Sequence, residues 1–268
     1  MNALCQMTGL DRAGFYRWRT PRHATPVEME IRDQMQKAAL ELPAYGYRRI
    51  TAELQQRGFA VNHKRVLRMM REDNLLCVRS RSFVVTTDSR HSLPVYPNLA
   101  REIQPTAINQ LWVADITYIR LRTEFVYLAV VLDAYSRRVI GWALGQTLEA
   151  GLAVTALRMA LIERKPPPGM VHHSDRGVQY ASLDYTAMLK QHQAIISMSR
   201  KGNPYDNAAC ESFMKTLKYE EVYRNEYRDF HEAKARLGEF LDRVYNQKRL
   251  HSALGYLPPA EFENGAMQ

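Results

Sequence analysis

Three acidic residues, far apart in the sequence, have the type and placement for chemistry on a phosphate. Asp115 lies inside the apolar stretch LWVADITYI, with no basic residue within four positions. A carboxylate in a buried strand loses its water, which is costly unless a partner compensates it. Asp175 ends the apolar run of VHHSD, and the ends of strands often carry functional groups in open α/β sheets. Glu211 lies in the first turns of a predicted helix.

Together these carboxylates offer the oxygen ligands that hard divalent cations prefer. Two such ions can clamp an in-line phosphoryl displacement, so the protein needs no covalent nucleophile. Lys215 and Lys218 follow Glu211 at helical spacing and share its face, which suits a phosphate track beside a metal ligand. Taken singly, each acid also has a structural interpretation. Asp115 could be held by backbone donors, Asp175 could be a turn residue before a glycine, and Glu211 could be an ordinary surface glutamate.

Other chemistries have weaker support. The pair His172-His173 lacks the companion spacing of a zinc site, and the chain has neither a GxxxxGK[ST] loop nor a GxSxG elbow. His173 lies close to Asp175 in the sequence. Its pattern leaves two interpretations open, a phosphate contact and a packed core residue.

The segment that must position the three acids, residues 105–268, has an α/β pattern. Apolar stretches at 109–121, 124–137 and 138–146 predict three strands joined by short connections, hence an antiparallel meander. A helix at 149–165 then leads to a strand at 170–175, a helix at 183–192 and a strand at 194–200. Helices at 211–222 and 229–246 follow, the last with a capping pair, Asp229 and Glu232. This order predicts a ribonuclease H-like mixed five-stranded sheet with flanking helices.

The segment before it is helical and basic. The net charge is +9, and most of it lies before residue 105, which favours a polyanion as partner. Helices are predicted at 3–8, 11–18 and 27–42, and a helix, glycine turn and basic helix within 45–75 resemble a helix-turn-helix. Candidate phosphate contacts there are Arg48, Arg49, Lys64, Arg65 and Arg68. We therefore expect an N-terminal helical segment at 1–24, a helix-turn-helix-like DNA-binding region at 25–85, a linker at 86–104 and a catalytic domain with C-terminal helices at 105–268.

The longer motifs resemble one family closely. Asp115, Asp175 and Glu211 are spaced as in the DDE pattern of retroviral-integrase-like transposases. The strings YLAVVLDAYSRRVIGW, HHSDRGVQY, NPYDNAACESFMKTLK and YNQKRLHSALGYLPPAEF resemble the second-frame (orfB) product of the insertion-sequence family three transposases. The resemblance covers nearly the whole chain, and the segment from YGYRRI to REDNL is similar to that family's helix-turn-helix-like region.

The resemblance implies a DNA transposase that cuts at terminal inverted repeats and transfers a 3′ end to target DNA. It implies two Mg²⁺ (or Mn²⁺) ions on Asp115, Asp175 and Glu211, and it places Lys218 at the residue that contacts the DNA end. Double-stranded DNA is the expected partner, with the first-frame (orfA) product or a fusion to it, and a homo-oligomer on DNA. The chain starts without the heptad run that the first-frame part carries.

Composition sets the remaining expectations. With 46% apolar and 24% charged residues, the 268-residue chain is an ordinary folded protein. It has no bilayer-length apolar run and no signal-peptide pattern at its start, and its three scattered cysteines fit a reducing cytosol, so we expect a bacterial cytoplasmic protein. Two other functions stay open: a DNA-binding regulator or inactive remnant that occupies element ends without cutting, and a general nuclease.

Overall fold

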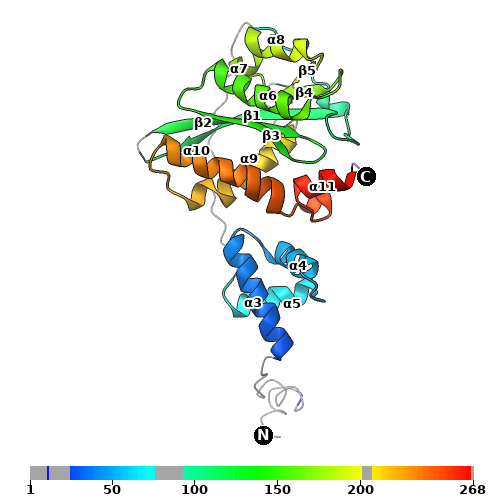
Figure 1. Ribbon diagram of the computed structural model, residues 1–268, viewed down its shortest axis with the longest axis vertical. Helices are drawn as coiled ribbons and strands as arrows, with labels where there is room; N and C mark the ends of the chain where they lie inside the picture. The colour runs from blue at the N-terminus through cyan, green and yellow to red at the C-terminus, as the bar shows by residue number, and fades with distance from the viewer. Residues whose placement is uncertain (1–10, 12–24, 76–92, 123, 201–206, 267–268) are drawn as a thin grey trace. The chain divides into compact units, whose positions relative to one another are not determined.

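The computed structural model describes residues 11, 25–75, 93–122, 124–200 and 207–266 (Figure 1). The chain divides into two compact units, Met1–Cys77 and Val78–Gln268. The helices predicted at 3–8 and 11–18, and the first part of the expected linker, lie outside the described residues. Residues 93–104, also expected to be linker, pack on the second unit: Leu99 donates its amide to the Ser197 hydroxyl, 2.9 Å away.

Over residues 25–75, the first unit is a cluster of three helices. It comprises α3 (Pro26–Glu41), α4 (Tyr47–Gln56) and α5 (His63–Glu72). Thr25 and Asn62 cap α3 and α5 by accepting backbone N–H groups, as their residue types favour. Ile31, Ile50 and Val66 are among the side chains that are fully or almost fully buried between the helices. The helix, glycine turn and basic helix predicted within 45–75 are confirmed as α4 and α5.

The second unit is built on a five-stranded mixed sheet with the order β3-β2-β1-β4-β5. The strands are β1 (Leu111–Arg120), β2 (Phe125–Asp133), β3 (Val139–Gly145), β4 (Val171–Ser174) and β5 (Ile195–Met198). β1, β2 and β3 form the predicted antiparallel meander, while β4 pairs in parallel with β1, and β5 with β4. The ribonuclease H-like arrangement is therefore confirmed.

Helices cover both faces of the sheet (Figure 1). On one face lie α6 (Ala150–Arg164), α7 (Val178–Ala181) and α8 (Leu183–Gln191), and on the other α9 (Ala208–Glu220) and α10 (Phe230–Glu239). Because both faces are covered, alternate residues of β1 enter two cores: Val113 packs on the α9 side and Trp112 on the α6 side. Residues of β1 with odd numbers near Val113 therefore face α9.

Two local features bring helices close to the sheet. A Cβ at Gly141 of β3 would lie 2.2 Å from the carbonyl oxygen of Ala156, so only glycine lets α6 approach this strand. After α10 the chain continues as a π-helix, η4 (Phe240–Lys248), where one regular helix was predicted. The side chain of Asn246 there pairs with the backbone N–H and C=O of Val139, at 3.0 and 2.8 Å.

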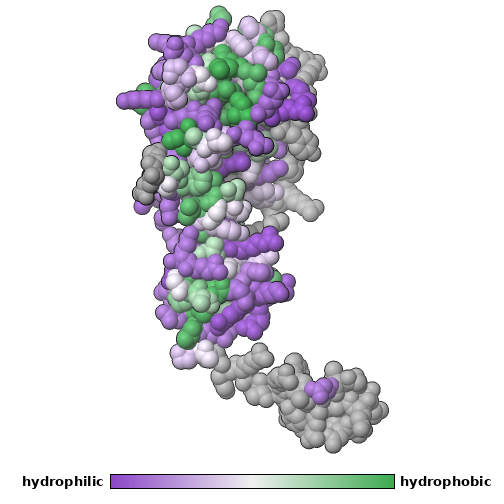
Figure 2. Space-filling model, turned by 90° about the vertical axis from the view of Figure 1, so that its right-hand side faces the viewer, coloured by the Kyte–Doolittle hydropathy of each residue, from purple (hydrophilic) through white to green (hydrophobic). Residues whose placement is uncertain are grey.

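The remaining short elements are η1 (Ala100–Glu102), η3 (Val222–Arg224), η5 (Ser252–Leu254) and the helix α11 (Pro259–Ala266). On the face shown in Figure 2, hydrophilic side chains cover much of the surface, with smaller apolar patches between them. None of the helices that the structure describes has the length and apolar character needed to cross a lipid bilayer.

Candidate active site

Asp115 projects from the middle of the central strand β1. Its sequence parity with Val113 places it on the face that α9 covers. One of its oxygens accepts the backbone N–H of Ile116 at 2.8 Å. Burial raises the pKa of Asp115 to about 7, and the nearby carboxylates of Asp175 and Glu211 add to the rise. Two other acids are thus near enough to oppose its ionisation, as like charges in one site do.

Asp175 directly follows β4, the strand that pairs in parallel with β1. The last pair in that ladder is Val113↔His173, so continuing the register two residues sets Asp175 level with Asp115. Adjacent strands run roughly 4.8 Å apart. The Asp175 carboxylate accepts the amide of Gly177 at 2.8 Å, and a Cβ at Gly177 would lie 3.0 Å from that same oxygen. The glycine thus lets the turn close on the aspartate.

Glu211 lies in the first turn of α9, on the helix that covers the Asp115 face of the sheet. Its side chain is 40% exposed, and the Lys215 ammonium lies 3.8 Å from its carboxylate. Lys218, one turn further on, is half-buried, and its ammonium lies 4.8 Å from the centre of the Tyr118 ring. Burial lowers the pKa of Lys218, while Asp115 raises it. The two predicted lysines and the glutamate therefore lie along one helix beside Asp115.

The donor set suits a hard cation in charge and in ligand type, since all three groups are carboxylates and Asp175 and Glu211 are near enough to raise the pKa of Asp115. Within the described part of the chain, however, no three His, Cys, Asp or Glu side chains stand close enough to hold a metal ion as they are. The three acids are therefore neighbours, but their side chains would have to move closer together to bind one ion.

His173 is a packed residue. It is fully buried, and its two ring nitrogens lie 2.8 Å from the Ser197 hydroxyl and 3.0 Å from the Ser199 hydroxyl. A ring enclosed in this way cannot touch a phosphate, so the structure favours the core interpretation over the DNA contact. His172 is also buried, bonded to Tyr185, and burial lowers its pKa to about 3.

The basic residues of the first unit divide into two sets. Arg48 and Lys64 are exposed, and Arg49 is partly so. Arg65 and Arg68 lie 3.9 and 3.8 Å from the carboxylate of Glu28, which also pairs with Arg32. Glu28 partly neutralises those two arginines, so Arg48 and Lys64 are the stronger candidates for phosphate contacts.

Three further sets of contacts near the site were not predicted from the sequence. Asn207 reaches the backbone of β1, donating to the carbonyl of Ala114 at 3.1 Å. Arg249, 3% exposed, makes two 2.8 Å contacts with the Glu220 carboxylate at the end of α9. Both contacts fix the helix that carries Glu211. Their only signal in the sequence was polar residues of ordinary loop and helix types.

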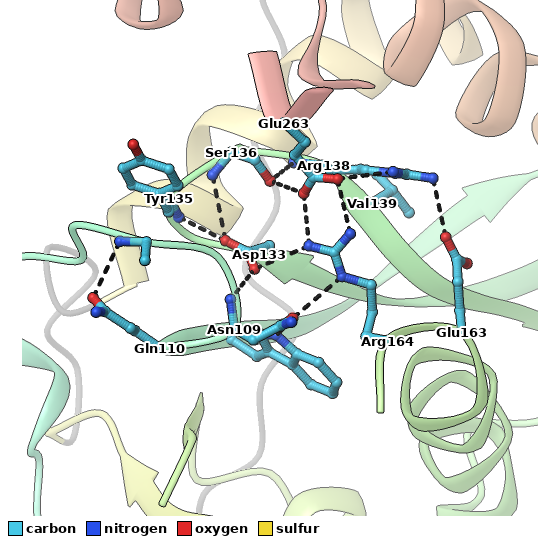
Figure 3. A network of polar contacts seen from close by, with 12 residues as sticks. Asn109, Gln110, Asp133, Tyr135, Ser136, Arg138, Val139, Glu163, Arg164 and Glu263 are labelled. Carbon is cyan, nitrogen blue, oxygen red and sulfur yellow. Dashed lines mark hydrogen bonds and ion pairs between the residues drawn. The ribbon is translucent and has the colours of Figure 1, made fainter. Parts of the chain in front are cut away.

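The third is a buried polar cluster that joins α11 to the sheet (Figure 3). The Glu263 carboxylate accepts from Ser136, Arg138 and both terminal nitrogens of Arg164, at 2.6–2.8 Å. Arg164 also contacts Asp133, 3.4 Å away. We call these five residues the α11 cluster. Apart from Arg138, their side chains are almost completely enclosed.

Comparison with known proteins identifies relatives along the whole chain. Residues 105–204 and 192–259 match families described as integrase core domains, and residues 26–83 match an HTH-like domain. The chain is 40% identical over 266 residues to the "Insertion element IS600 uncharacterized 31 kDa protein" of Shigella sonnei, covering 97% of each. It is 37% identical over 270 residues to "Transposase InsF for insertion sequence IS3A" of Escherichia coli (strain K12), covering 98% of this chain and 94% of that protein.

Among solved structures, the catalytic core domain of HTLV-2 integrase "in complex with magnesium (trimeric form)" matches with a TM-score of 0.47 and 14% identity. The match covers 60% of this chain and 99% of that one.

Proposed function

The chain belongs to the transposases of insertion-sequence family three, and on that premise we propose that Asp115, Asp175 and Glu211 are its metal-binding carboxylates. It is a DDE transposase, an enzyme that cleaves DNA and transfers strands, and its substrate is DNA. The proposal concerns which residues of this chain perform that reaction and how.

One observation carries the assignment. Continuing the register of β1 and β4 sets Asp115 level with Asp175, and α9 brings Glu211 over the same face of the sheet. Without a cation, ionisation of all three carboxylates is unfavourable, because burial and the carboxylates of Asp175 and Glu211 raise the pKa of Asp115. A divalent cation would reverse that balance and hold all three acids ionised.

We propose two Mg²⁺ or Mn²⁺ ions for this site. When bound, such ions activate the attacking hydroxyl and stabilise the leaving 3′ oxygen. The residues of the chain then have separable tasks. Asp115 and Asp175 provide oxygens from two neighbouring strands, and Glu211 provides one from a helix. Lys215 and Lys218 lie further along that helix, where cationic groups can hold the phosphates of a DNA end.

The first unit adds affinity for the element ends. Its exposed Arg48 and Lys64 would contact phosphates, which position the protein on DNA without reading bases. Terminal inverted repeats and target DNA are the proposed binding sites, at the bacterial nucleoid in the cytoplasm. We also propose that the chain works as an oligomer on DNA, together with the first-frame product or fused to it.

The test uses labelled element ends, target DNA and Mg²⁺. We expect Asp115→Asn, Asp175→Asn and Glu211→Gln each to abolish cleavage and joining while DNA retention persists. Asp184→Asn, which alters an exposed carboxylate in the same unit, is the matched control and should join normally. Substantial joining by any of the three variants would show that the ligands are misassigned.

The product separates this function from its rivals. Joining at a defined end distinguishes a transposase from a general nuclease, which would degrade DNA without choosing an end. A wild-type chain that retains ends but never cuts them, even with the first-frame product present, would instead be a regulator or an inactive remnant.

A further inference from the structure

Asn207 stands at the N-cap position of α9 but does not cap it. At such positions a side-chain oxygen normally accepts a backbone N–H of the first turn. Asn62 does so at the start of α5, accepting from Arg65 at 2.9 Å. Ser182 and Asp229 likewise cap α8 and α10. The side chain of Asn207 makes no such bond, so the amide is used for something else.

That use is a hydrogen bond to the central strand. The Asn207 amide nitrogen donates to the carbonyl oxygen of Ala114, 3.1 Å away and 93 positions earlier in the chain. Ala114 is the residue before Asp115, and Asn207 is one helical turn before Glu211. A single bond therefore joins the two elements that carry two of the three carboxylates, close to each of them.

The bond lies at the edge of β1 that faces β4, while β2 pairs with the other edge through Ala114 and Asp115. The paired residues of β1 and β4 end at Val113↔His173, so Ala114 lies just beyond the ladder that fixes this edge of β1. Metal ligands tolerate little misplacement, because Mg²⁺ requires near-ideal octahedral geometry at roughly 2.0–2.1 Å. A shift of α9 along β1 would move Glu211 relative to Asp115 and spoil a shared ion.

We infer that Asn207 is a positioning residue that holds Glu211 at the correct distance from Asp115 for metal binding. The inference rests on the proposed function, since it takes these two acids as metal ligands. In this inference Asn207 is not itself a metal ligand. Its role is to fix the start of α9 to the backbone beside Asp115.

The experiment measures Mn²⁺ binding directly, by the electron paramagnetic resonance signal of free Mn²⁺, with the full chain and an element-end duplex. Two variants are compared with wild type, Asn207→Ala and Asn207→Ser. Serine supplies a capping oxygen for α9, yet it is too short to reach Ala114. Losing a residue that orients metal ligands weakens affinity by roughly 10–100-fold.

We expect both variants to bind Mn²⁺ about tenfold more weakly, at the lower end of that range because Asn207 acts through the backbone. Their thermal midpoints and DNA retention should stay as in wild type. Joining should need correspondingly more Mn²⁺ and recover its maximal rate at saturation. A variant that only folds less well would lose maximal rate as well, whereas here the Mn²⁺ requirement rises and the maximal rate is unchanged.

Three results would overturn the inference. Wild-type Mn²⁺ affinity in both variants would show that the bond to Ala114 is dispensable. Wild-type behaviour of Asn207→Ser alone would mean that α9 needs only a short polar side chain at its N-cap position and no bond to Ala114. Weaker binding accompanied by an equal loss of maximal rate and of thermal stability would mean a purely structural role.

A parallel titration of Asp115→Asn separates this inference from the function beneath it. If Asp115→Asn loses Mn²⁺ while the Asn207 variants keep it, only the positioning role fails. If Asp115→Asn binds Mn²⁺ like wild type, the ligand assignment itself is wrong.

Discussion

Replacing Glu263 by alanine would remove the carboxylate at the centre of the α11 cluster (Figure 3). Glu263 has no exposed surface and accepts hydrogen bonds from Ser136, Arg138 and Arg164. Arg164, whose side chain is 7% exposed, would keep the Asp133 carboxylate at 3.4 Å and the Asn109 side-chain oxygen at 3.2 Å, but it would lose both of its shorter contacts with Glu263. The variant therefore leaves a buried guanidinium that is only partly compensated.

The expected loss in the free energy of unfolding depends on how well the remaining contacts compensate Arg164. Removing one partner of a buried ion pair costs about 3–5 kcal/mol, because the other charge stays buried. Since Asp133 still compensates part of the charge, we expect the lower end, about 3 kcal/mol. In a unit of this size 1 kcal/mol corresponds to roughly 2–4 °C, so the midpoint should fall by about 6–12 °C.

The assay is thermal unfolding of the full chain at pH 7, followed by circular dichroism. Glu261→Ala is the matched control, because Glu261 is exposed on the same helix. Its midpoint should stay within about 2 °C of wild type, as surface changes usually contribute under 0.5 kcal/mol. If Glu263→Ala shifts the midpoint no more than this control does, the cluster is not the compensated network described here.

Acidification offers a second measurement on the same residue. Burial acts to raise the pKa of Glu263, but hydrogen bonds from Arg164, Ser136 and Arg138 outweigh it and lower the pKa. A lowered pKa in the folded state means that the ionised carboxylate stabilises the fold above its ordinary pKa. That stability is lost as pH falls through the folded-state value. The stability difference between wild type and Glu263→Gln should therefore be constant near neutrality and shrink in acid.

Two further predictions concern other parts of the chain. Gly141→Ala should destabilise the second unit by several kcal/mol in urea unfolding, because the new Cβ would meet the carbonyl of Ala156 at 2.2 Å; a loss below 1 kcal/mol would contradict the close approach of α6. Lys64→Ala should lower the slope of log affinity against log salt by about one unit in DNA binding. Lys37→Ala, an exposed lysine paired with Asp33, should leave that slope unchanged, and an equal effect of both would place the DNA surface elsewhere.

The elements of the fold were predictable because they depend on local pattern. Both faces of β1 are apolar, the meander has short turns, and Asn62 and Asp229 are capping residues before apolar stripes. The parallel direction of β4 followed from connection length, since a helix must intervene between parallel strands. The π-helix after Phe240 was missed because its cause is tertiary: Asn246 pairs with the backbone of an edge strand.

The candidate site was predictable in its acids but not in its supports. Asp115 stood out as a carboxylate inside an apolar strand, and the spacing of the three acids follows a family pattern. Asn207 and Arg249 did not stand out, because an asparagine in a loop and an arginine after a helix are common at surfaces. His173 shows the limit of proximity in sequence: it is two residues from Asp175, yet it points between two serines.

The α11 cluster also has a consequence for how the chain is made. Glu263 is synthesised 127 positions after Ser136, whereas every contact inside the first unit is complete before residue 78. During synthesis the first unit can therefore fold early, while the second waits for α11. A stop codon arising between residues 165 and 263 would release a product whose first unit is intact and whose second unit holds Arg164 without its main acidic partner. Decayed copies of such an element would yield chains that proteolysis removes, rather than lasting competitors for its ends.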